Sequence, residues 1–125
     1  MYGIIATWRM ALEGISKADS MLKNNESAAD SIEEAIKAVE DFEYYKSVGY
    51  GGLPNEEMEV ELDAAFMDGD TLEFGCVGGV KDFANPVSIA RSLMHYDANN
   101  FLVGQGAEKY ASRHGFERKT MLTDR

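Results

Sequence analysis

The chain has 125 residues and a mass of 13.8 kDa, which is enough for one domain with a real core, because a chain of this size buries about two-thirds of the surface that its unfolded form exposes. Its hydrophobic fraction of 45% and charged fraction of 27% exclude collagen-like, coiled-coil and wholly disordered proteins. The formal net charge of −10 repels phosphate backbones and anionic lipids, so we expect neither nucleic acid nor a membrane as a partner.

The first eight residues are largely apolar and predict a β-strand that ends at Trp8. This start lacks the basic leader and the cleavage region of a signal peptide. No segment approaches the roughly 20 apolar residues of a membrane-spanning helix. We therefore expect a cytoplasmic protein.

Two amphipathic helices are predicted next. In residues 10–23, apolar residues recur at the helical spacing of three and four, and Asn24 and Asn25 tolerate the left-handed backbone that ends a helix. A second helix begins near Ser27, a favourable N-cap. The residues predicted on its buried face are Ile32, Ala35, Ile36 and Val39. The residues predicted on its solvent face are Glu33, Glu34, Lys37 and Glu40.

A β-hairpin is predicted in the middle of the chain. Apolar and acidic residues alternate from Met58 to Ala64, as in a half-buried strand. Asp68-Gly69-Asp70 then predicts a tight turn into a second strand over residues 71–77.

The rest of the chain predicts two more helices and a strand. Asn85-Pro86 opens a helix, residues 101–104 form a short buried strand, and a last helix runs from Gln105 to a stop at Gly115. We therefore expect a mixed α/β (α+β) fold in one domain, residues 1–125. Residues 116–125 are polar and predict a tail without a hydrophobic anchor.

The glycine-rich segments are only weak evidence for phosphate or nucleotide binding. Residues 49–52 lack the Lys and the Ser or Thr of a P-loop, and they precede a strand rather than a helix. Gly104-Gln105-Gly106 lacks the third glycine of the dinucleotide fingerprint.

The thiol and imidazole groups leave one catalytic alternative open. Cys76, His95 and His114 are separate in the sequence, but a Cys–His dyad requires only proximity in space. A buried thiol and a histidine near a helix C-terminus are equally ordinary structural features. The single cysteine excludes an internal disulfide and an all-cysteine metal cluster.

Carboxylates and the single tryptophan provide the other candidates. Asp63, Asp68 and Asp70 could bind a hard cation, although turn formation accounts for the last two. Trp8 lies where the first predicted strand ends, so its indole forms either a flat wall of a ligand site or part of the core. We expect no metal and no cofactor.

Several segments, taken in order, resemble the glycosylasparaginase branch of the N-terminal-nucleophile asparaginases. Ala6-Thr7-Trp8 is similar to the opening of that family, and residues 29–33 to its second-helix signature. The most specific segment is 47–55, Ser-Val-Gly-Tyr-Gly-Gly-Leu-Pro-Asn. The segments that continue the match are 62–64, 67–69, 85–91, 102–104 and 122–123.

The resemblance implies an αββα sandwich whose precursor cuts itself into an α chain and a β chain. The N-terminal Thr of the β chain attacks the side-chain amide of an asparagine derivative, and its own α-amine accepts the hydroxyl proton. This sequence corresponds to the α-chain portion, and its last ten residues would lead to the linker and the β chain. The expected partner is that β chain, in an (αβ)2 assembly.

The resemblance also assigns residues to the site. Trp8 lines the substrate pocket, and Met10 stands where relatives have an aromatic residue, which weakens the contact with a sugar. Ser47 is the supporting hydroxyl beside the nucleophile. Gly49 and Gly51 provide tight backbone near the site.

Two further features complete the assignment. Asp63 is expected to be a structural residue near the site. The nucleophile motif Asp-Thr-Ile/Val-Gly is absent, since Asp70-Thr71 continues into Leu72-Glu73, so this chain alone is expected to be inactive.

The expected substrate is a glycoasparagine or another asparagine-derived small molecule. Two other interpretations stay open: an isoaspartyl peptidase or L-asparaginase of the same family, and a catalytically inactive stand-alone binding or assembly module. Against the module, half of an αββα sandwich would leave a sheet edge and an apolar face uncovered.

Overall fold

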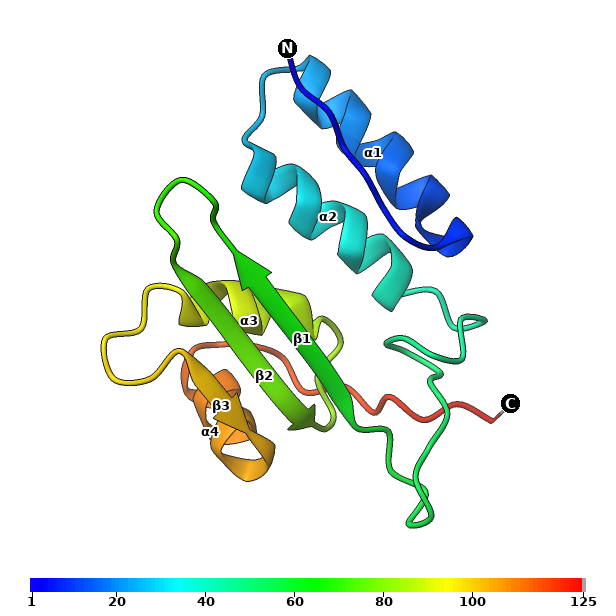
Figure 1. Cartoon of the computed structure of the whole chain (residues 1–125). Coiled ribbons are helices and arrows are strands. Elements are labelled where there is room, and N and C mark those ends of the chain that lie inside the picture. Colours follow the sequence, from blue (N-terminus) through cyan, green and yellow to red (C-terminus); the bar gives the residue numbers. More distant parts are fainter. Residues whose placement is uncertain (125) are drawn as a thin grey trace.

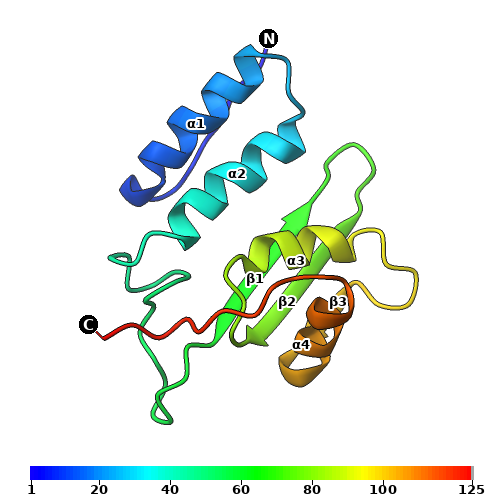
Figure 2. The ribbon, with the colours of Figure 1, turned by 180° about the vertical axis from the view of Figure 1, so that it is seen from behind.

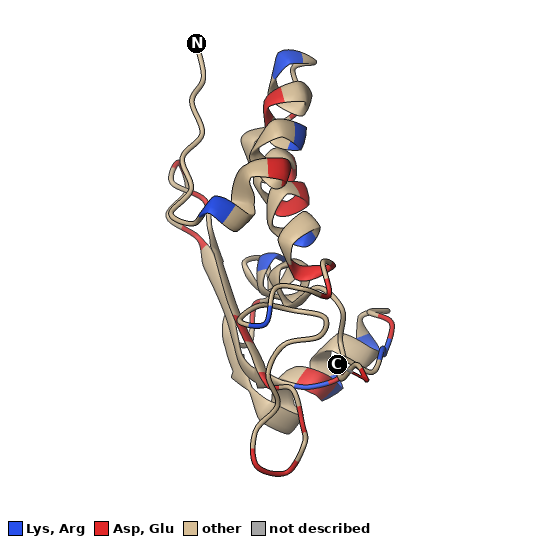
Figure 3. Cartoon of the chain, turned by 90° about the vertical axis from the view of Figure 1, so that its right-hand side faces the viewer, with Lys and Arg blue, Asp and Glu red and all other residues tan. Residues whose placement is uncertain are grey.

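The structure, a computed structural model, describes residues 1–124 as a layer of helices on one face of a small sheet. The elements follow in the order η1 (Arg9–Ala11), α1 (Leu12–Lys23), α2 (Ala28–Glu40), β1 (Leu62–Met67), β2 (Phe74–Val80), α3 (Pro86–Leu93), β3 (Phe101–Val103) and α4 (Gly104–Arg113). Seen edge-on, the sheet has the α-helices on one side and open space on the other (Figure 3). The predicted α+β class is confirmed.

The sheet has the strand order β1-β2-β3. β1 and β2 form the predicted antiparallel hairpin, and β3 joins β2 in parallel (Figure 1). α3 and α4 pack on the inner face of this sheet (Figure 2). The largest fully buried side chains of this core include Phe83, Ile89, Leu93 and Met121.

α1 and α2 form an antiparallel helical hairpin next to β1 (Figure 1). Asn25, with a φ of 61°, provides the predicted left-handed stop between them. The helices approach closely where Gly14 lies against the backbone of Ala35. Lys17 on α1 also binds Glu34 on α2 at 2.5 Å. Among the described residues, no helix is long and apolar enough to cross a membrane.

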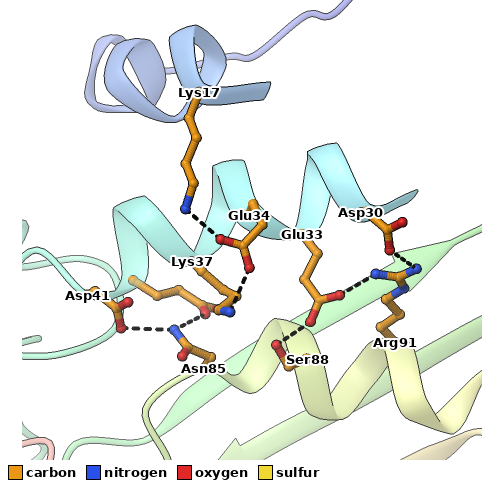
Figure 4. Close-up of polar contacts among 10 residues, drawn as sticks. Lys17, Asp30, Glu33, Glu34, Lys37, Asp41, Asn85, Ser88 and Arg91 are labelled. Carbon is orange, nitrogen blue, oxygen red and sulfur yellow. Dashed lines mark hydrogen bonds and ion pairs between the residues drawn. The ribbon is translucent and has the colours of Figure 1, made fainter. Parts of the chain in front are cut away.

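Polar contacts fasten α2 to α3. Arg91 binds Asp30 at 2.7 Å and also binds Glu33, which accepts a second hydrogen bond from Ser88 (Figure 4). These contacts determine which face of α2 is turned toward α3.

The N-cap of α2 is the residue expected from the sequence. The Ser27 hydroxyl accepts a hydrogen bond from the Asp30 amide at 3.0 Å. The Ser27 hydroxyl and Arg91 together hold the pKa of Asp30 below its usual range. We expect Ser27→Ala to lower the free energy of unfolding by about 1 kcal/mol, as measured by urea denaturation. Ser20→Ala, in the exposed last turn of α1, is the matched control, and an equal loss in both variants would contradict the capping role.

Three expectations about strands are wrong. Residues 1–6 are extended but belong to no strand, because no other described strand pairs with them. β1 begins at Leu62 rather than near Met58, whose φ is 61°. β3 is not a buried strand, since Phe101 and Val103 are 57% and 59% exposed on the outer face of the sheet.

The C-terminal segment has a hydrophobic anchor, although its polar composition predicted none. Met121 is 1% exposed in the core, and its carbonyl accepts a hydrogen bond from the Gly51 amide at 2.9 Å. Arg118 pairs with Phe83 in an isolated β-bridge. Residues 116–121 therefore lie against the molecule, and the expected linker beyond the C-terminal segment stays a prediction.

Candidate active site

A cavity of about 470 Å³ lies between the N-terminal segment, the helical hairpin and the loop that follows α2. The residues that line it are Ile4, Ile5, Ala6, Thr7, Trp8, Met10, Ala11, Ile15, Ile32, Ala35, Ile36, Val39, Ser47 and Val48. The wall is apolar because the inner stripes of α1 and α2 face the extended N-terminal residues. Before Arg9, that segment has no charged residue (Figure 3).

Trp8 and Met10, at the start of η1, meet at this cavity with Ser47, which is distant from them in the sequence. Trp8 is the N-cap residue of η1 and its side chain is 70% exposed, so its indole is a wall rather than part of the core. Met10 follows within η1 and is half-buried. The structure thus brings together Trp8 and Met10, which the sequence analysis placed at the substrate, and Ser47, which it placed beside the nucleophile.

Ser47 comes from a tightly folded loop after α2. Gly49 has a φ of 59° and lies directly on the backbone of Glu40, where a Cβ would overlap the carbonyl oxygen. Gly51 has a φ of 77°, and a Cβ there would lie 2.6 Å from the Glu43 carbonyl oxygen. No residue of the described chain hydrogen-bonds the Ser47 hydroxyl, which leaves it available to a ligand or another chain.

Asp63 lies away from the cavity, on the sheet. Its Oδ1 accepts a hydrogen bond from the Gly79 amide at 2.8 Å, where the β1–β2 register shifts between Leu62 and Ala64. This contact is structural, as expected. Asp63 is not among the residues that line the cavity.

The other candidates do not gather into a site. His114 stacks on Tyr110, with 3.9 Å between the ring centroids, whereas Cys76 lies on β2. Asp68 accepts hydrogen bonds from the Asp70 and Thr71 amides, as a turn residue does. Within residues 1–124, no three His, Cys, Asp or Glu side chains are placed to hold a metal ion.

The cavity lacks any titratable side chain among its lining residues. Thr7 and Ser47 contribute hydroxyls and Trp8 contributes an indole N–H, but none has a general base beside it in the cavity wall. A hydroxyl becomes an effective nucleophile only when a base accepts its proton. The arrangement can therefore bind and orient a ligand, but its lining residues do not include both a nucleophile and the base that would activate it.

Comparison with known proteins identifies the family. The family model described as asparaginase matches residues 5–125. The chain belongs to the asparaginase family. The resemblance found in the sequence motifs is thereby confirmed.

Curated members of the asparaginase family match most of this chain. An N(4)-(beta-N-acetylglucosaminyl)-L-asparaginase of Elizabethkingia miricola is 35% identical over 96% of this chain and 35% of its own length. An isoaspartyl peptidase/L-asparaginase of Rattus norvegicus is 38% identical over 90% of this chain and 36% of its own. A plant-type L-asparaginase of Thermococcus kodakarensis is 36% identical over 97% of this chain and 35% of its own. The chain thus spans about a third of the length of these relatives.

One residue of this asparaginase-family chain next to the site escaped sequence analysis. Glu40 was placed on the solvent face of α2, but it is only 3% exposed. Its position four residues after Ile36 was the available signal, because residues separated by four share one helix face.

Proposed function

We propose that this chain is the α subunit, or the α-chain portion of a precursor, of an amidohydrolase that cleaves the side-chain amide of glycosylated asparagine. The nucleophile is an N-terminal Thr on a β chain that is not part of this sequence. The observation that carries the proposal is the cavity, where Trp8, Met10 and the unbonded Ser47 hydroxyl meet and no titratable side chain is present. For this cavity to act as an amidase site, a nucleophile and a base must come from another segment.

In the proposed reaction, the Thr hydroxyl attacks the carbonyl carbon of the substrate amide while the α-amine of the same Thr accepts the hydroxyl proton. The C–N bond breaks, the amino group leaves with a proton, and an aspartyl ester forms on the Thr. Water then hydrolyses the ester and restores the hydroxyl. This chain supplies the Trp8 wall that positions the substrate and the Ser47 hydroxyl that orients the Thr.

The open face of the sheet supports the proposed β chain as partner. The apolar side chains exposed on or beside the strands there include Met67, Phe74, Phe101 and Val103. Exposed apolar patches of this kind mark interaction surfaces. A second sheet from the β chain would cover this face, and a strand of the β chain would pair with the unpaired residues 1–6. An (αβ)2 assembly is the expected oligomer.

The substrate is proposed to be glycosylated because the Elizabethkingia miricola relative named for that activity matches nearly the whole chain. The alternative is an isoaspartyl peptidase or L-asparaginase, which the Rattus norvegicus relative favours at 38% identity. Met10 is compatible with either, since it offers no aromatic face to a sugar.

The decisive experiment uses the complete product of the gene. Mass spectrometry should find a second chain that begins with Thr, and the purified protein should release amino sugar from N-acetylglucosaminyl-asparagine faster than it cleaves an isoaspartyl dipeptide. The reverse preference would establish the alternative substrate. A stable product of 13.8 kDa alone, with no amidase activity, would instead establish an inactive binding or assembly module.

Substitution of Trp8 tests whether its indole contacts the substrate. We expect Trp8→Ala to raise KM roughly tenfold in the complete protein, because a bound ligand loses the apolar surface of the ring. The measurement is steady-state turnover of N-acetylglucosaminyl-asparagine. Leu12→Ala is the control, since Leu12 is 56% exposed nearby but does not line the cavity. An unchanged KM in Trp8→Ala would remove Trp8 from the site.

A further inference from the structure

Glu40 is buried at the junction of three segments, although nothing in the proposed reaction uses it. It is the last residue of α2, and Glu40 and Ser31 are the polar residues that the described chain buries most completely. A carboxylate is rarely buried unless hydrogen-bond donors hold it. Its partners therefore indicate what it does.

The Glu40 carboxylate joins the end of α2 to the beginning of α3. Its Oε1 accepts a hydrogen bond from the Val87 amide at 3.2 Å, and its Oε2 accepts one from the Asn85 side chain, also at 3.2 Å. Asn85, the N-cap residue of α3, makes no capping hydrogen bond with its own side chain and donates to Asp41 at 2.9 Å as well (Figure 4). Glu40 thus replaces the missing cap.

The backbone of Glu40 also contacts the loop after α2 that carries Ser47, which we call the Ser47 loop. The Tyr50 amide donates to the Glu40 carbonyl at 2.7 Å. Gly49 lies against the Cα and carbonyl of Glu40, at a distance that no other residue allows. Ser47 is two residues before Gly49, so a displacement of Glu40 must move the chain that presents the Ser47 hydroxyl to the cavity.

The surroundings of Glu40 are arranged around an acid that can lose its proton near neutral pH. Burial is the main cause that raises its pKa to about 7, and Glu33 and Asp41 on its own helix raise it further. On α3, the hydrogen bonds from Asn85 and Val87 oppose this rise. On the C-terminal segment, the Lys119 ammonium lies 3.9 Å from the centroid of the Tyr50 ring.

We propose that Glu40 is a positioning residue, which holds the Ser47 hydroxyl at the substrate cavity by fastening the Ser47 loop to the junction of α2 and α3. The ionised carboxylate accepts both donors at once. An amide in its place turns one acceptor into a donor that faces Asn85 or Val87, and the junction must shift. The effect on turnover rests on the proposed function, whereas the effect on the loop does not.

The kinetic test is a double-mutant cycle in the complete protein. Glu40→Gln should lower kcat about tenfold at about pH 8 with little change in KM. In the Ser47→Ala background, Glu40→Gln should have no further effect. Asp41→Asn, which alters the exposed neighbour that shares Asn85, is the matched control. An equal loss in the Ser47→Ala background, or no loss at all, would overturn the proposal.

Hydrogen exchange tests the same contact without activity. Glu40→Gln should accelerate exchange of the Tyr50 and Val87 amides about tenfold at about pH 8. Asp41→Asn should leave both amides protected. Unchanged protection in Glu40→Gln would overturn the positioning role even if the protein is active. Faster exchange in a protein without amidase activity would support the positioning role and remove the proposed function instead.

Discussion

Gly49→Ala should be among the most damaging single substitutions in this chain. The new methyl group would need a φ of 59°, which costs about 1 kcal/mol or more for a residue with a Cβ, and it would overlap the backbone of Glu40. Backbone atoms at the end of a helix cannot rotate away as a flexible side chain can. We expect a loss of about 3 kcal/mol in the free energy of unfolding, measured by urea denaturation.

Two glycines of the same chain separate the causes of that loss. Gly79 has a similar φ of 57° with nothing near its missing Cβ, so Gly79→Ala measures backbone strain alone and should cost about 1 kcal/mol. Gly69 has open space and no such φ, so Gly69→Ala should be nearly neutral. If Gly49→Ala cost no more than Gly79→Ala, the close approach to Glu40 would be unimportant.

The helices could be predicted from the sequence because the signals that define them are local. Ser27 caps α2, Pro86 opens α3, and Gly115, with a φ of 84°, follows α4 as its stop. Each signal acts within one or two turns of its own helix, so no knowledge of the rest of the fold is needed.

The strands were less predictable because a strand depends on its partner. Residues 1–6 have the composition of a strand, but within the described chain none of the three strands offers them a partner. The alternation that starts at Met58 fails for a local reason: the Asn55 side chain accepts hydrogen bonds from the Glu57 and Glu59 amides and closes a turn there. β1 can begin only beyond that turn.

The candidate site depended on the family resemblance rather than on spacing. Trp8 and Ser47 are separated by both helices of the α1–α2 hairpin, so no periodicity places them together. Glu40, in contrast, could have been found from spacing, because the helical period places it on the same face as Ile36. It was missed because an acidic residue was assumed to face solvent. Its burial depends on donors from α3, which are distant in the sequence.

The pH dependence of stability should reveal the buried Glu40 carboxyl. An unfolded chain ionises this group near the ordinary value of 4.5, whereas burial raises its pKa to about 7 in the folded protein. Between these pH values the folded state keeps a proton that the unfolded state has released, so the free energy of unfolding falls as pH rises. The stabilisation is complete below about pH 4.5 and is lost above about pH 7, with a size on the order of 3 kcal/mol.

Glu40→Gln removes this titration without changing the size of the side chain. Urea denaturation of the variant should show a flatter pH profile than that of the wild type, because the variant has no side chain that is neutral in the folded protein and ionised in the unfolded chain between about pH 4.5 and about pH 7. Asp41→Asn, on the exposed neighbouring residue, removes only a smaller contribution to the pKa of Glu40 and should keep most of the slope of the wild type. Parallel profiles for Glu40→Gln and the wild type would show that Glu40 ionises in the folded protein as it does in the unfolded chain, and that its burial against α3 carries no free-energy cost.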